Sequence, residues 1–142
     1  YRSWMTNNAA QFHYVSASPI QLYVPLSEFI SNKGFPSGTF HLKDFRWKDE
    51  QFLSLFVSPE EYKPGVIEPL LKRFPARKFV LVGDDGEKDP EIYADVARRY
   101  SDQIVRVFIR DVTGEGQNAE RFIRAFDGVP ASKWKLFKDA GE

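Results

Sequence analysis

The sequence predicts an α/β fold in which parallel strands alternate with helices in a Rossmann-like, three-layer arrangement. Short apolar runs recur along the chain, and each is followed by a polar turn and then by a segment whose apolar residues have helical spacing. This alternation is typical of parallel βαβ units. The chain has 142 residues, which is enough for one domain with a buried core.

Four apolar runs are the expected strands, and they span residues 12–15, 39–42, 79–82 and 104–109. The run at 79–82 is continuously apolar, which indicates a strand covered by helices on both faces. The run at 104–109 is longer and partly alternating, which favours a position nearer the edge of the sheet.

Three segments have the spacing of amphipathic helices, and they span residues 19–31, 64–74 and 90–100. Ser18 precedes Pro19 as an expected N-cap followed by a first-turn proline. Asp89 is the expected cap of the third helix.

Two stretches do not fit the alternation. Residues 45–62 have no clean period, and residues 115–142 contain a short helical segment and a final apolar segment at 134–137. We therefore expect one main domain over residues 1–114 and a helical or irregular extension over residues 115–142.

Composition limits the classes of function. Lysine plus arginine equals aspartate plus glutamate at 20 each, so no global field favours nucleic acid, and any phosphate site must be local. The absence of cysteine excludes disulfides, thiolate zinc sites and a cysteine nucleophile. No apolar run approaches the roughly 20 residues that span a bilayer, and no signal-peptide pattern is present, so we expect a soluble protein.

An acidic loop follows the continuously apolar strand and contains Asp84, Asp85 and Asp89. In a parallel sheet the ligand crevice lies at the carboxyl ends of the strands, where this loop would emerge. Magnesium prefers such hard oxygen ligands, typically one or two carboxylates together with waters and a phosphate. Taken alone, the loop slightly favours the structural alternative, an Asx turn followed by acidic residues at a helix N-terminus.

Ser16 and Ser18 follow the first expected strand, where hydroxyls and backbone amides form a natural phosphate cradle. Ser18 alone is more typical of a helix cap, so Ser16 is the better candidate. Lys63 opens the second expected helix, where its charge opposes the helix dipole. A phosphate would favour a lysine at this place, and a solvated surface lysine is the equal alternative.

Four other polar positions carry less weight. Lys43 and Asp44 follow the second strand, where a surface ion pair is the favoured interpretation. His13 and His41 lie within apolar strands without a partner at metal-ligand spacing, so we assign them no catalytic role.

Several phrases agree in order and spacing with one known family. They are FHYVSASP at 12–19, HLKDF at 41–45, KPG at 63–65, KFVLVGD at 78–84, DPEIY at 89–93 and IRDV at 109–112. Their order resembles the second, third and fourth motifs of the haloacid dehalogenase superfamily. The residues of these motifs are more similar to the actin-patch-associated phosphatidate phosphatases, one family of that superfamily, over about Phe12 to Val112.

The resemblance implies a haloacid dehalogenase-type parallel sheet and a magnesium-dependent phosphatase. Such an enzyme converts phosphatidate to diacylglycerol and phosphate through an aspartyl-phosphate. Residues 1–114 would be the C-terminal part of its catalytic domain. The substrate would be phosphatidate or a related phosphate monoester, and the protein would be cytoplasmic with peripheral membrane contact.

The resemblance also assigns roles to the candidate residues. Ser16, with Ser18, would bind a phosphoryl oxygen, and Lys63 would neutralise charge on the nucleophile and the phosphate. Asp84 would hold Mg²⁺, with Asp85 or Asp89 as the second acidic position. Asp85 departs from the family, where we expect a small polar residue such as serine, so the second position stays open.

The first motif of the superfamily, an aspartate-x-aspartate pair after the central strand, is expected upstream of Phe12. Residues 1–11 contain no acidic residue. We therefore expect a fragment whose sheet lacks the central nucleophile strand, inactive and poorly folded in isolation. The alternative from a different class is a non-catalytic module that binds phosphate or protein.

Residues 45–62 lie where this superfamily can insert a cap. Their aromatic and leucine side chains would line an approach for acyl chains or, as we slightly favour, cover the sheet. These side chains are Phe45, Trp47, Phe52, Leu53, Leu55 and Phe56.

Overall fold

The computed structural model describes residue 4, residues 10–44 and residues 59–139. For residues 59–61 it describes the backbone alone. The chain divides into two compact units, Tyr1–Val66 and Ile67–Glu142, and each is described by itself. Most of the expected cap segment, including its aromatic residues at 45–56, lies outside the described residues.

Unit 1 contains a parallel pair of strands, β1 (His13–Pro19) and β2 (Thr39–Lys43). The crossover between them consists of a 3-10 helix, η1 (Ile20–Leu22), and α2 (Tyr23–Asn32). Pro25 lies in the first turn of α2, where a missing N–H has no cost, and Gly34 follows its end with a φ of 68°. The structure therefore contains the strands expected at 12–15 and 39–42 and the helix expected at 19–31.

The expected cap at Ser18 is wrong. Strand β1 continues through Pro19, and Pro19 itself precedes η1 without a side-chain cap hydrogen bond. Because the first helical turn begins at Ile20, one residue later than expected, the Ser18 hydroxyl lies on the strand.

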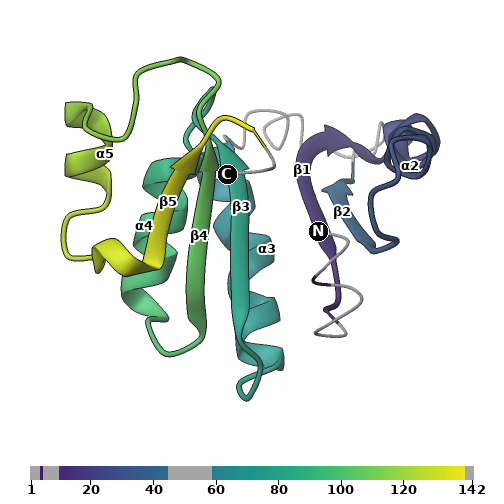
Figure 1. Ribbon diagram of the computed structural model, residues 1–142. Coiled ribbons are helices and arrows are strands. Elements are labelled where there is room, and N and C mark those ends of the chain that lie inside the picture. The colour runs from purple at the N-terminus through teal and green to yellow at the C-terminus, as the bar shows by residue number, and fades with distance from the viewer. Residues whose placement is uncertain (1–3, 5–9, 45–58, 140–142) are drawn as a thin grey trace, which may run out of the picture. The chain divides into compact units, whose positions relative to one another are not determined.

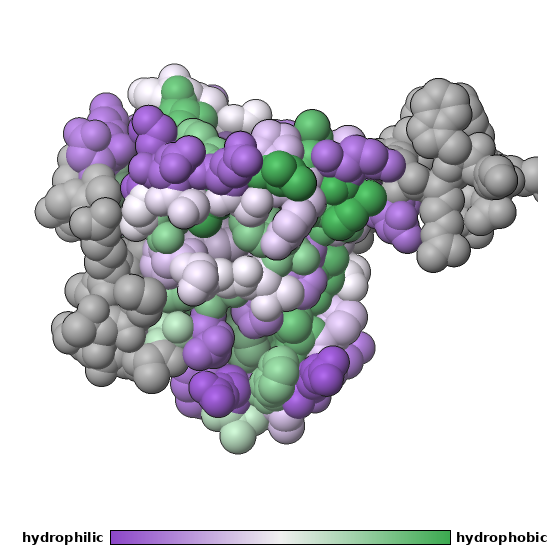
Figure 2. All heavy atoms as spheres, turned by 90° about the vertical axis from the view of Figure 1, so that its right-hand side faces the viewer, coloured by the Kyte–Doolittle hydropathy of each residue, from purple (hydrophilic) through white to green (hydrophobic). Residues whose placement is uncertain are grey.

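The face of unit 1 that carries α2 exposes apolar side chains, which Figure 2 shows among polar ones. Val24 and Phe29 are each more than half exposed, and α2 contributes no buried residue. Helix α2 therefore adds little to a core.

Helix α3 (Pro59–Arg73) begins five residues earlier than the sequence predicted. The predicted segment began at Pro64, but the helix runs through both Pro64 and Pro69. Lys63 therefore lies a full turn inside the helix, and the expectation that it opens the helix is wrong. At the other end, Gln103 Nε2 donates to Leu71 O and Phe74 O at 3.0 and 3.1 Å.

Unit 2 is a three-stranded parallel sheet with the order β3-β4-β5. Its strands are β3 (Phe79–Asp84), β4 (Ile104–Arg110) and β5 (Trp134–Phe137). The connections contain α4 (Asp89–Arg99), α5 (Glu120–Ala125) and the 3-10 helix η3 (Ala131–Lys133). The α/β class with parallel sheets is confirmed, in two small sheets.

The expectation that the 104–109 strand lies nearer the edge of the sheet is wrong within unit 2. This strand is β4, and β5 pairs with it on the side away from β3. The segment 134–137, assigned from sequence to the extension over 115–142, supplies that third strand. The division of the domain at residue 114 stays a prediction.

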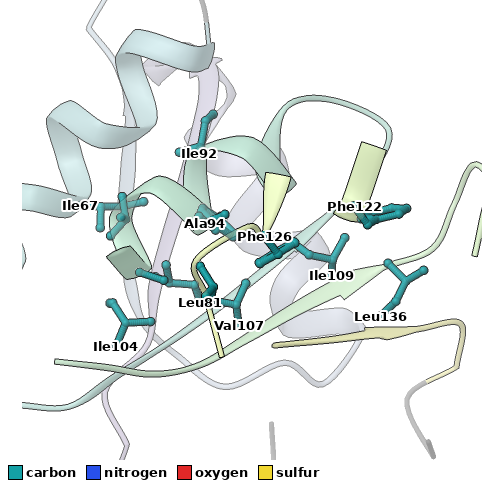
Figure 3. Close-up of a cluster of buried hydrophobic side chains, with 14 of the residues drawn as sticks. Ile67, Leu81, Ile92, Ala94, Ile104, Val107, Ile109, Phe122, Phe126 and Leu136 are labelled. Atoms are coloured by element: carbon teal, nitrogen blue, oxygen red, sulfur yellow. The ribbon is translucent and has the colours of Figure 1, made fainter. Parts of the chain in front are cut away.

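The core of unit 2 lies between the sheet and its helices. The C-terminal part of α3 and α4 cover one face of the sheet in Figure 1, and the buried side chains meet there in Figure 3. Leu81, Val107 and Ile109 point into this core, whereas Val80 and Val105 are exposed. The expectation of helices on both faces of β3 is therefore not met within unit 2.

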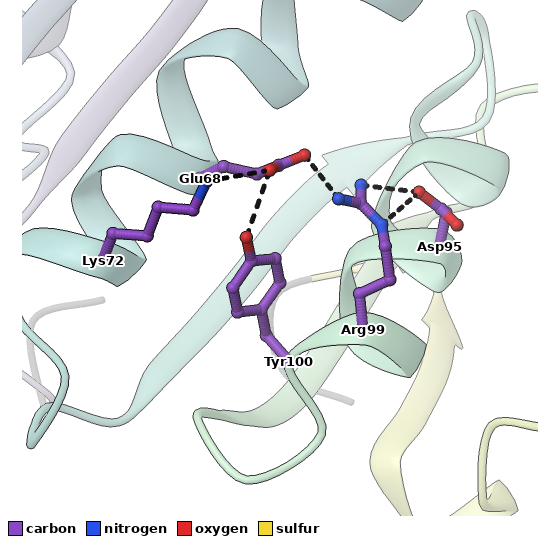
Figure 4. Close-up of polar contacts among 5 residues, drawn as sticks. All are labelled: Glu68, Lys72, Asp95, Arg99 and Tyr100. Carbon is purple, nitrogen blue, oxygen red and sulfur yellow. Dashed lines mark hydrogen bonds and ion pairs between the residues drawn. The ribbon is translucent and has the colours of Figure 1, made fainter.

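A polar network joins α3 to α4 at the surface (Figure 4). Arg99 contacts Glu68 of α3 and Asp95 of its own helix, with N···O distances of 2.5 and 2.6 Å. Tyr100 Oη donates to the same Glu68 at 3.1 Å. Hydrogen bonds and charge from Arg99 lower the pKa of Glu68. Since these groups are partly exposed, the network orients the helices with a small gain in stability.

Candidate magnesium and phosphate site

Asp84 ends β3 and is exposed at the carboxyl edge of the sheet. Its Oδ1 accepts a hydrogen bond from Gly86 N at 3.0 Å, which closes an Asx turn. The turn expected from sequence is thus present, and it orients a carboxylate toward solvent.

Asp89 is the first residue of α4 and is 4% exposed. Its Oδ2 accepts a hydrogen bond from Asp84 N at 3.3 Å. The residue before α4 is Lys88, and no side-chain hydrogen bond caps the helix, so the expectation that Asp89 is its cap is wrong. Its carboxylate instead faces the end of β3.

Gly83 makes this approach possible. A Cβ atom at residue 83 would lie 2.2 Å from Asp89 Oδ2 and 2.7 Å from the ring of Tyr93. Only glycine allows the strand end and the helix to come this close without a shift.

Asp85 is 1% exposed, and both of its carboxylate oxygens accept hydrogen bonds from the loop after β4. Oδ1 accepts from Val112 N at 2.7 Å and Thr113 N at 3.1 Å, and Oδ2 accepts from Thr113 Oγ1 at 2.6 Å. Burial alone raises the pKa of Asp85, but these hydrogen bonds outweigh it and leave the pKa lowered. Asp85 therefore ties the ends of β3 and β4 together.

Arg121 of α5 also contacts the acidic loop, through backbone carbonyls and through Glu91. Its guanidinium donates to Asp85 O at 2.7 Å and to Glu87 O, and it meets the Glu91 carboxylate at 2.8 and 3.1 Å. Burial raises the pKa of Glu91, but the hydrogen bonds from Arg121 outweigh it and leave the pKa lowered. Sequence reasoning missed both Arg121 and Thr113, because neither lies near the loop in the chain.

Asp111 closes the loop after β4. Its Oδ1 accepts from Gly114 N at 2.6 Å, and its Oδ2 is buried without a hydrogen bond, 3.9 Å from Lys138 Nζ. The backbone N–H of Asp111 donates to Phe137 O at 2.8 Å, which continues the ladder from β4 to β5.

Ser16 and Ser18 lie together at the end of β1 in unit 1. Ser16 Oγ donates to Ser18 Oγ at 2.9 Å and accepts from Ser18 N at 3.2 Å. The register between β1 and β2 shifts between Val15 and Pro19, the stretch that carries both serines. Such irregularities commonly re-aim side chains next to functional sites.

Lys63 is 8% exposed, so the alternative of a solvated surface lysine is wrong. Lys43 Nζ lies 5.5 Å from the centre of the Tyr62 ring. His13 Nδ1 and His41 Nε2 are hydrogen-bonded to each other at 3.0 Å, and burial lowers the pKa of both imidazoles.

The structure brings the three acidic candidates together in unit 2 and the two serines together in unit 1, with Lys63 in the unit 1 part of α3. Within the described ranges, no group of three or more histidines, cysteines or acidic residues is arranged to hold a metal ion. Magnesium commonly takes only one or two carboxylates from a protein, and the exposed Asp84 beside Asp89 fits that donor set.

An acidic loop at the carboxyl end of a parallel strand, with a glycine that admits a buried carboxylate, is typical of α/β proteins, in which ligands bind at this edge of the sheet. Residues 1–111 match the family model described as "Phosphatidate phosphatase APP1, catalytic domain". The chain belongs to this family, as the sequence phrases predicted.

Two relatives are similar over most of the chain. Phosphatidate phosphatase APP1 of Saccharomyces cerevisiae is 39% identical over 70% of this chain and 16% of its own length. An uncharacterised protein of Schizosaccharomyces pombe is 35% identical over 78% of this chain and 18% of its own length. The chain thus spans less than a fifth of these relatives.

No solved structure matches the chain significantly. Of the helices that the structure describes, none has the length and apolar character needed to cross a membrane.

Proposed function

We propose that this chain supplies the magnesium-binding and phosphate-binding part of a phosphatidate phosphatase with a Rossmann-like, haloacid dehalogenase-type fold. The proposal depends on one observation, the exposed Asp84 beside the buried Asp89, whose approach to the strand requires a glycine at position 83. The chain that carries this pair belongs to a phosphatidate phosphatase family. Because phosphatidate is a membrane lipid, we expect the whole protein to contact membranes peripherally.

In this proposal Asp84 holds Mg²⁺ and Asp89 is the second acidic position. Asp85 is less suited, because its two oxygens already accept three hydrogen bonds from Val112 and Thr113. Bound magnesium would supply positive charge beside the phosphate oxygens. Asp89 orients the backbone of Asp84, and the Asx turn orients its carboxylate.

Ser16 would donate a hydrogen bond to a phosphoryl oxygen in place of its hydrogen bond to Ser18 Oγ, and the backbone N–H of Ser18, at 3.2 Å, would hold the Ser16 oxygen in position. The buried Lys63 would neutralise charge on the nucleophile and the phosphate. Such electrostatic positioning provides most of the acceleration in phosphoryl transfer.

The nucleophile of this reaction is an aspartate that we expect in an aspartate-x-aspartate pair upstream of Phe12. It attacks phosphorus, diacylglycerol leaves with a proton from the second aspartate, and water hydrolyses the aspartyl-phosphate. We therefore expect the isolated chain to release no phosphate from phosphatidate.

The test is Mg²⁺-dependent phosphate release from phosphatidate by the whole protein and by its Asp84→Asn variant. We expect Asp84→Asn to lower the rate roughly 100-fold or more, because one preorganised charge contact is lost. The matched control is Asp102→Asn, an exposed aspartate just before β4, at the amino edge of the sheet. This control should retain the rate of the parent.

Full activity in Asp84→Asn would remove Asp84 from the metal site. If the whole protein releases no phosphate from phosphatidate or from a soluble phosphate monoester, the alternative of a non-catalytic binding module is correct.

A further inference from the structure

Arg121 contacts the backbone of the acidic loop at two carbonyl groups, Asp85 O and Glu87 O. These carbonyls flank Gly86, whose N–H donates to Asp84 Oδ1 at 3.0 Å. Arg121 therefore contacts the loop at the point that orients the Asp84 side chain.

The link to Asp84 passes through one rigid group. The carbonyl of Asp85 and the N–H of Gly86 belong to the same peptide unit, which is planar. When Arg121 fixes the direction of that carbonyl, it also fixes the direction of the N–H that binds Asp84 Oδ1. The distance from Arg121 to Asp85 O is 2.7 Å, so the contact is a full hydrogen bond.

Glu91 in turn fixes the guanidinium. Arg121 Nε donates to Glu91 Oε1 at 2.8 Å and an Nη donates to Oε2 at 3.1 Å, a bidentate pair. The pair is partly buried, with side-chain exposures of 26% and 37%. Lysine has a single compact ammonium and cannot reproduce this fork while also reaching two carbonyls.

We propose that Arg121 is a positioning residue for the magnesium site, acting on Asp84 through the Asp85–Gly86 peptide. This inference rests on the proposed function of Asp84. The family model ends at residue 111, so the residue that sets the loop comes from the segment that follows the matched region. Residues 115–142 would then be a functional part of the enzyme.

The direction of the effect separates positioning from charge. Arg121 places a cation near the loop, so on charge alone its removal would favour Mg²⁺ binding. If Arg121 instead acts by positioning the loop, its removal weakens Mg²⁺ binding, because the Asp84 carboxylate loses its fixed direction. The loss of a group that orients a metal ligand typically weakens affinity about 10–100-fold.

The experiment uses the whole protein and compares Arg121→Gln, Arg121→Lys and Arg124→Gln. Arg124 is the matched control, because it lies on the same helix, is 76% exposed and pairs with Glu120. Isothermal titration with MgCl₂ gives the Kd, and thermal unfolding without magnesium gives the Tm. We expect a Kd about 10–100-fold weaker in both Arg121 variants and unchanged in Arg124→Gln. Half-maximal activity should require correspondingly more Mg²⁺, with a smaller change in kcat at saturation.

An Arg121→Gln variant that binds Mg²⁺ as tightly as the parent, or more tightly, overturns the inference, whatever its Tm. Recovery of the parent Kd in Arg121→Lys also overturns it, because the guanidinium fork would then not be needed to orient the loop. The Asp84→Asn variant separates the two proposals. If it leaves the Kd unchanged, the magnesium site itself is wrong and the inference falls with it. If it weakens the Kd and Arg121→Gln does not, only the role of Arg121 is wrong.

Discussion

Three aspartates of the same loop have different environments. Asp84 is exposed, Asp89 is buried beside a glycine, and Asp85 is buried with three hydrogen bonds to its carboxylate. Burial of a carboxylate is costly unless hydrogen bonds compensate for the lost water. At Asp85 the compensation comes from the loop after β4, so the charge of this residue stabilises the fold.

The Asp85→Asn variant should be less stable than the parent by about 1–2 kcal/mol at pH 7, because hydrogen bonds to a charged acceptor are stronger than neutral ones. The pKa of Asp85 is lowered on folding, so its contribution is present above the unfolded pKa of about 3.9. That contribution is lost as the pH falls through the folded pKa.

Thermal unfolding of both proteins between pH 7 and pH 3, without magnesium, measures this difference. The difference between the two stabilities should begin to shrink as the pH falls below about 4, whereas the exposed-site variant Asp102→Asn should follow the parent throughout. A difference between parent and Asp85→Asn that is the same at every pH would rule out the charge of Asp85 as its cause.

The sequence located the acidic loop but could not rank its carboxylates. Asp84, Asp85 and Asp89 all suit a magnesium loop by spacing alone. The groups that distinguish them come from far along the chain, since Thr113 is 28 residues from Asp85 and Arg121 is 36 residues from it. Side-chain partners at that separation depend on the folded sheet.

At the scale of elements, the apolar runs predicted β1 to β4, and their order along the chain predicted parallel pairing. The sequence assigned β5 to an extension because four residues are too few to show a period. It also began α3 too late, because a proline in a helix interior looks the same in sequence as one in a first turn. Tertiary packing decides both cases.

Strand β5 is attached to the core through α5. The Phe126 ring stacks on Trp134, at the start of β5, with ring centres 4.2 Å apart and an interplanar angle of 4°. Phe122 is fully buried next to them, with its ring 6.4 Å from Trp134. The short strand is therefore stabilised by aromatic packing as well as by its ladder with β4.

The Phe126→Ala variant should lose about 3–5 kcal/mol of stability, because a buried aromatic ring is replaced by a cavity. Ile123→Ala is the matched control in α5, the helix that ends just before Phe126, since Ile123 is 61% exposed and should change stability by less than about 0.5 kcal/mol. Urea unfolding of the whole protein measures both. Equal small losses would show that α5 does not stabilise the core.

At the scale of the whole molecule, the two units have unequal means of stabilisation. Unit 2 has a three-stranded sheet with the buried cluster of Figure 3, whereas the described part of unit 1 has two strands and an α2 without buried residues. A pair of strands alone is marginally stable in water. The expectation that the chain is poorly folded in isolation therefore applies most strongly to unit 1.

Hydrogen exchange on the isolated chain tests this difference. Backbone amides of β1 and β2 should exchange faster than those of β3 and β4, because local opening requires less free energy where fewer apolar contacts are broken. In the whole protein the protection of β1 and β2 should increase. Equal protection of both units in a monodisperse, cooperatively melting monomer would contradict the expectation.

The strands of unit 2 occupy the sheet in the same order as in the chain, β3-β4-β5. If folding begins during synthesis, each strand would emerge next to a partner that is already in place, and the sheet would grow at one edge. Asp85 would meet Val112 and Thr113 once the loop after β4 has emerged, whereas Arg121 would arrive only with α5. We therefore expect a nascent chain that ends before α5 to carry the acidic loop without its contacts to Arg121.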